Sequence, residues 1–61
     1  MPNITIEGPP LRDMEKKRVL VREITGAAAK AFGLPAQTIV ILIKENPPEN
    51  VGIGGQLLAD R

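Results

Sequence analysis

The sequence contains no cysteine, histidine, serine, tyrosine or tryptophan, and only one phenylalanine. Without cysteine the chain can form no disulfide, and without cysteine or histidine it lacks the usual ligands of zinc. The Ser–His–Asp and Cys–His forms of nucleophilic catalysis are excluded for the same reason. The acidic residues do not follow the spacing of a calcium-binding loop, so the sequence predicts neither a metal nor a cofactor.

Charge is nearly balanced, with eight basic and seven acidic residues that are interspersed along the chain. A nucleic-acid-binding domain would carry a basic patch and aromatic side chains for stacking, so no nucleic-acid partner is expected. The longest apolar run, Ile39 to Ile43, is too short to span a bilayer, and the N-terminus lacks a secretory signal pattern. We therefore expect a cytoplasmic protein with no membrane partner.

The length of the chain limits its stability as a monomer. Its 61 residues fit one domain, residues 1–61, but a chain of this size buries only about 60% of the surface that its unfolded form exposes. Disulfides and structural metals are absent from the sequence. The sequence therefore predicts that the chain gains stability by forming a homo-oligomer.

The first half of the chain reads as a strand followed by a helix. Apolar and polar residues alternate from Pro2 to Glu7, which predicts a strand that ends at the Gly-Pro-Pro sequence beginning at Gly8. From Asp13 to Phe32 the apolar residues recur at helical spacing. Asp13 suits the N-cap of this helix, and Gly33 suits the left-handed position after its last turn.

The second half predicts another strand and a hairpin or irregular segment. Ile39 to Ile43 is continuously apolar, as expected of a strand buried on both faces. Strand, helix and strand form a β-α-β unit of the α+β class, with parallel strands and the helix on one face of the sheet. The other face would be bare within the subunit. Val51 to Gly55 contains too many glycines for a helix or a central strand.

The residue inventory leaves one unusual candidate for a catalytic base, Pro2, which follows the initiator methionine. Small second residues permit removal of Met1, which would free a secondary amine. Such an amine acts as a base only when unprotonated, so its pKa must be depressed by an apolar pocket or a nearby cation. A Met-Pro N-terminus alone is weak support, because many proteins begin this way.

Several motifs together resemble the 4-oxalocrotonate tautomerase family over essentially the whole chain. They are Met1-Pro2 before a short strand, Arg12 before the helix, Leu20 to Ile24 within it, Pro35 after it, an aliphatic second strand, and Gly52 to Gly55. The resemblance implies a β-α-β subunit with a small C-terminal hairpin. It also implies assembly into homo-oligomers, typically hexamers, in which a partner covers the bare sheet face.

The resemblance assigns roles to two residues. Pro2 matches the catalytic proline that moves a proton between the enol oxygen and a remote carbon of a small unsaturated 2-oxo acid. Arg12 matches an arginine that binds a substrate carboxylate from a neighbouring subunit. A guanidinium suits this role because it grips a carboxylate with two hydrogen bonds and stays charged at any working pH.

The chain departs from the family pattern at two positions of the expected pocket wall. Val40 aligns with a second arginine that holds the other carboxylate of the substrate, and Val51 aligns with an active-site phenylalanine. A valine cannot bind a carboxylate, so efficient action on dicarboxylates is not expected. Lys44 has the same strand parity as Val40 and is an alternative source of positive charge.

Two interpretations remain open. In the first, the chain is a tautomerase that acts on small enol or 2-oxo acids through Pro2. In the second, it keeps the fold and the assembly but binds a ligand without efficient turnover, an interpretation that Val40 and Val51 favour. A retained Met1 would support the second, because the Pro2 nitrogen would then be an amide.

Overall fold

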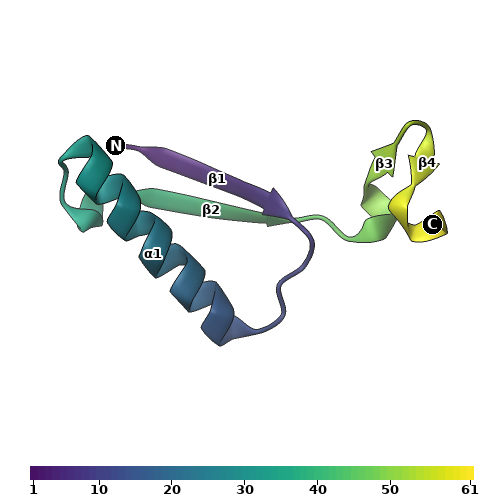
Figure 1. The fold of residues 1–61 in the computed structure, drawn as a ribbon, viewed down its shortest axis with the longest axis horizontal. Coiled ribbons are helices and arrows are strands. Elements are labelled where there is room, and N and C mark those ends of the chain that lie inside the picture. Colours follow the sequence, from purple (N-terminus) through teal and green to yellow (C-terminus); the bar gives the residue numbers. More distant parts are fainter.

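The computed structural model describes all 61 residues and shows a β-α-β unit followed by a small hairpin (Figure 1). The prediction of the fold class is confirmed. The elements are β1 (Asn3–Gly8), α1 (Met14–Phe32), β2 (Val40–Glu45), β3 (Gly52–Ile53) and β4 (Gln56–Leu57), with short 3-10 turns at Ala36–Thr38, Pro48–Asn50 and Leu58–Asp60.

Both predicted ends of α1 are confirmed by its capping. The Asp13 carboxylate accepts hydrogen bonds from the backbone N–H groups of Glu15 (2.9 Å) and Lys16 (3.3 Å). At the other end Gly33 has φ 66°, a conformation that glycine adopts without steric cost. The helix is therefore stopped where the chain must turn back toward β2. α1 is not apolar enough along its length to span a membrane.

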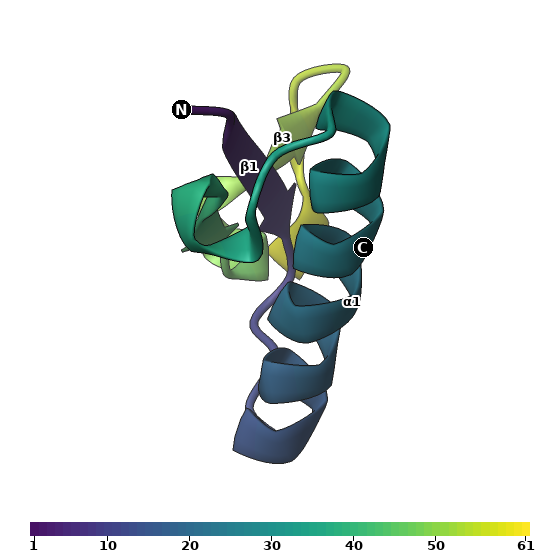
Figure 2. The same ribbon diagram turned by 90° about the vertical axis from the view of Figure 1, so that its left-hand side faces the viewer.

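β1 and β2 pair in parallel, with Asn3 opposite Val40 and Gly8 opposite Glu45. The burial of β1 alternates, because Ile4 and Ile6 are partly covered while the residues between them are exposed. α1 runs along one side of β1 (Figure 2). The sheet therefore has one face toward the helix and one open face, as the sequence predicts.

Within the single subunit β2 is covered on one face only, which agrees with the prediction that the other sheet face is bare. Leu42, in the middle of β2, keeps 52% of its surface exposed. Its neighbours Ile41 and Ile43 have the opposite parity and are more covered. The apolar run continues onto the open face, where this chain provides no covering layer.

The C-terminal segment forms an antiparallel hairpin, β3 with β4, at the end of the sheet farthest from the N-terminus (Figure 1). Gly54 and Gly55 form its turn with φ values of 60° and 86°, which explains the glycines in this segment. A hydrogen bond from Leu58 N–H to the Val51 carbonyl (2.8 Å) closes its base. Ile53, on the hairpin, is 52% exposed.

The subunit is too extended to be a stable globule by itself. No residue is fully buried, and the accessible surface is 4721 Å², whereas a compact monomer of 6.6 kDa would expose about 3,900 Å². The radius of gyration is 14.7 Å, against about 10.5 Å for a compact chain of this length. The subunit therefore leaves apolar surface that no other part of the chain covers.

Candidate active site

Pro2 is held at the start of the sheet by the strand pairing. Its carbonyl accepts a hydrogen bond from the Val40 N–H at 3.0 Å, which extends the β1–β2 ladder by one residue. Pro2 is partly covered, whereas Met1 is 84% exposed. The carbonyl of Pro2 is therefore fixed against β2, and Met1 projects beyond the strand pairing.

The part of β2 beside Pro2 is uncharged. Val40 lies beside it, and no Asp, Glu, Lys or Arg occurs between Gly33 and Ile43. Lys44 lies near the other end of β2, opposite Glu7. β2 therefore places no cation next to the Pro2 nitrogen.

Arg12 lies at the opposite end of the sheet, in the loop between β1 and α1. The preceding residue, Leu11, donates its backbone N–H to the Glu45 carboxylate at the end of β2. Since Pro2 is anchored at Val40, the two anchor points are separated by the length of β2, about 17 Å at 3.3 Å per residue. Pro2 and Arg12 therefore cannot act on one small molecule within one subunit.

Glu45 is a residue that the sequence analysis missed. Its second carboxylate oxygen accepts a bond from Lys17 Nζ at 3.1 Å. The hydrogen bond from Leu11 and then the bond from Lys17 hold the pKa of Glu45 below its usual value, with a smaller contribution from the charge of Arg12. The sequence did offer one indication of this role: Glu45 has the same strand parity as Ile41 and Ile43, so its carboxylate lies on the face that α1 covers.

This lowered pKa predicts how acid affects the fold. A carboxylate with a lowered pKa contributes stability that is complete above its ordinary pKa and is lost as the pH falls through the lowered value. As the pH falls from the ordinary pKa of a glutamate through the lowered pKa of Glu45, we expect the free energy of unfolding of the wild type to decrease. That of Glu45→Gln should decrease less. Denaturant unfolding at several pH values measures this. Identical pH profiles for the two proteins would contradict the assignment.

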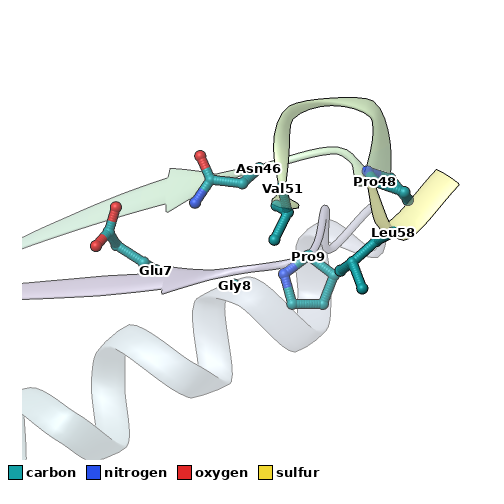
Figure 3. A pocket seen from close by; sticks show the side chains of 7 residues that line it. All are labelled: Glu7, Gly8, Pro9, Asn46, Pro48, Val51 and Leu58. Carbon is teal, nitrogen blue, oxygen red and sulfur yellow. The ribbon is translucent and has the colours of Figure 1, made fainter. Parts of the chain in front are cut away.

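Val51 lines an open hollow of ≈ 300 Å³ between the ends of β1 and β2 and the hairpin. The other lining residues are Glu7, Gly8, Pro9, Asn46, Pro48 and Leu58. Val51, Pro9 and Leu58 lie close together in the view of Figure 3. The hollow is at the same end of the sheet as Arg12 and does not include Pro2, so it is not by itself a site around the proline.

The structure thus divides the four predicted site residues into two groups. Pro2 and Val40 lie together at one end of the sheet, and Arg12 and Val51 lie near the other. No cluster of three or more His, Cys, Asp or Glu side chains that could hold a metal ion is present. A site that combines the two groups requires more than one subunit.

Comparison with known proteins agrees with the fold. The family model described as "Tautomerase enzyme" matches residues 2–61. A 2-hydroxymuconate tautomerase of Pseudomonas sp. strain CF600 is 37% identical over 51 residues, which cover 84% of this chain and 76% of that protein.

Two solved structures extend the comparison. The crystal structure of DmpI from Archaeoglobus fulgidus is 47% identical, with a TM-score of 0.85, and covers 97% of this chain and 100% of that one. A heterohexamer 4-oxalocrotonate tautomerase from Chloroflexus aurantiacus is 33% identical, with a TM-score of 0.84. The match covers 98% of this chain and 97% of that one. The chain thus has the β-α-β tautomerase fold. It belongs to the tautomerase family, among relatives of 4-oxalocrotonate and 2-hydroxymuconate tautomerases.

Proposed function

We propose that this protein is a tautomerase that catalyses keto–enol proton transfer on small unsaturated 2-oxo acids, with Pro2 as the base and then the acid. The observation that supports it best is the position of Pro2 in a member of the tautomerase family: a hydrogen bond to Val40 holds it beside the uncharged start of β2. The test is ketonisation of 2-hydroxymuconate and of phenylenolpyruvate by protein from which Met1 has been removed.

In the proposed reaction the Pro2 nitrogen takes the proton of the 2-hydroxyl group. As the C=O bond forms, the double bond shifts, and the protonated amine returns a proton to the remote carbon. Nothing is oxidised or reduced and no atom is gained or lost, so the chemistry needs no cofactor. The amine must start unprotonated, and apolar surroundings favour that form because they disfavour the cation.

Arg12 of a neighbouring subunit would bind the carboxylate of the substrate. Its guanidinium makes no hydrogen bond or ion pair within its own subunit, so its donors are available to another molecule. Two hydrogen bonds from the guanidinium would orient the substrate and draw its electron density toward the carboxylate end. Val51 would form part of the apolar wall.

Val40 makes substrate choice testable. We propose that the uncharged residue beside Pro2 favours monocarboxylates, because a second carboxylate at that point would have no cation to pair with. The substitution Val40→Arg is expected to raise kcat/KM for the dicarboxylate 2-hydroxymuconate, relative to phenylenolpyruvate, by about tenfold or more. Steady-state kinetics on both substrates measures the ratio. Val40→Met is the uncharged control, and an equal rise in that variant would contradict the explanation.

We also propose that the chain assembles as a homo-oligomer, with a hexamer favoured. The exposed Leu42 on the open sheet face, the exposed hairpin and the extended shape of the subunit support this assembly. A solved relative is a heterohexamer, which makes six subunits the first number to test.

Replacing Leu42 with aspartate is expected to weaken the assembly, because it puts a charge in place of an apolar side chain at the proposed interface. Loss of one buried leucine alone corresponds to about tenfold to 10²-fold in the dissociation constant. Light scattering after size-exclusion chromatography at several protein concentrations measures the shift. Lys16→Asp, on the polar side of α1, is the control and should leave the mass unchanged. An unchanged mass for Leu42→Asp would place the interface elsewhere.

The alternative is an assembly that keeps the fold but binds a ligand without efficient turnover, which Val40 and Val51 favour. It predicts an intact oligomer whose ketonisation rate, after removal of Met1, is no higher than that of Pro2→Ala.

A further inference from the structure

Glu45 connects three separate segments of the subunit. It ends β2, one carboxylate oxygen accepts the Leu11 N–H of the loop before α1, and the other accepts Lys17 Nζ of α1. The Glu45 side chain is 32% exposed and that of Lys17 23%, so the pair is partly shielded from water. Both oxygens are thus engaged at the end of the sheet where Arg12 lies.

The loop that carries Arg12 has no other hydrogen bond to hold it. Pro9 and Pro10 have no N–H group, and the bond from Leu11 to Glu45 is the only one that residues 9 to 12 make within the chain. Asp13 then begins the helix cap. The Glu45 carboxylate is therefore the one hydrogen-bond partner of the loop just before Arg12.

Arg12 follows Leu11 directly, and its charge is close enough to Glu45 to contribute to the lowering of that residue's pKa. Even so, no ion pair joins the two side chains. The two oxygens of Glu45 are hydrogen-bonded to Leu11 and Lys17, and neither is bonded to the guanidinium. Glu45 can therefore fix the backbone beside Arg12 while leaving the donors of Arg12 free.

We propose that Glu45 is a positioning residue, which anchors Leu11 and so holds Arg12 in the orientation that binds the substrate carboxylate at a neighbouring subunit's Pro2. This inference rests on the proposed function. A misplacement of about 1 Å in a substrate-orienting group can cost 10²-fold in rate. We expect Glu45→Ala to lower kcat/KM for phenylenolpyruvate by about tenfold to 10²-fold.

A double-mutant cycle separates this role from a general structural one. If Glu45 acts through Arg12, Glu45→Ala lowers kcat/KM in the wild-type background but has no further effect in the Arg12→Ala background. Glu45→Gln keeps an acceptor for Leu11 N–H and should recover most of the activity. The control is Glu15→Gln, which removes a helix-surface ion pair to Arg18 (3.2 Å) that does not touch the loop. It should retain the wild-type rates.

Two results would overturn the proposal: wild-type kcat/KM in Glu45→Ala, or an effect of that substitution that is equally large when Arg12 is already alanine. If Glu45→Ala does not assemble, the cycle is run with Glu45→Asp, which keeps the charge but cannot reach both partners, and the same two results decide. Pro2→Ala is assayed alongside. If the wild type is no faster than Pro2→Ala, the proposed function has failed. If the wild type is fast and Arg12→Ala is slow, but the effect of Glu45→Ala is the same with and without Arg12, only this inference has failed.

Discussion

Replacing Pro2 with alanine is expected to lower kcat/KM for enol ketonisation by about 10²-fold, within the range that a positioned acid–base group contributes. Alanine is also a small second residue, so Met1 should still be removed and a free amine would remain. That amine is primary, and it lacks the ring that fixes the proline nitrogen beside Val40. The loss therefore measures the basicity and the placement of the prolyl nitrogen. Stopped-flow or steady-state absorbance with phenylenolpyruvate follows the reaction.

The comparison requires two checks. Mass spectrometry must show that both proteins have lost Met1, and light scattering must show the same assembly for both. The strand pairing should survive the substitution, because it uses the carbonyl of residue 2 and not its side chain. Equal rates in two proteins that pass both checks would remove Pro2 from the mechanism.

Mixing two defective proteins is expected to restore activity. Arg12→Ala alone should lower kcat/KM by about 10²-fold to 10³-fold, as loss of a donor to a reacting group commonly does. Each subunit of a mixture of Pro2→Ala and Arg12→Ala has one defect. If a site takes Pro2 from one subunit and Arg12 from another, random reassembly gives both intact residues in about a quarter of the sites. The mixture should then approach a quarter of the wild-type rate.

This prediction follows from the length of β2, which separates the two residues within one chain. The subunits are mixed under mild denaturant, reassembled by dilution and assayed with phenylenolpyruvate. Each variant taken through the same cycle alone is the control, and neither should gain activity. A reassembled mixture no more active than the mean of its two parents would mean that the sites are not shared in this way.

The sequence was a good guide wherever the determinants are local. The alternation around Ile4 and Ile6 predicted β1 to within one residue at each end, and Asp13 and Gly33 marked the helix caps. These features depend on side chains that act on their own or nearby backbone. The glycines at positions 54 and 55 likewise reported a turn through their positive φ angles.

What the sequence could not predict depends on contacts between distant segments. Glu45 is bonded to Leu11, 34 residues away, and to Lys17, 28 residues away, and no local pattern indicates such a pair. The cover of the open face of β2 is a related case. The apolar side chain of Leu42 suits a covered face, but no part of the same subunit covers it.

The most direct test of the central claim compares one preparation before and after its N-terminal methionine is removed. Protein that retains Met1 has an amide at the Pro2 nitrogen, which cannot serve as a base. Treatment with a methionine aminopeptidase should raise the ketonisation rate in proportion to the processed fraction found by mass spectrometry, to a final gain of about 10²-fold or more. If the rate is the same for fully retained and fully processed protein, the Pro2 amine is not the catalytic group.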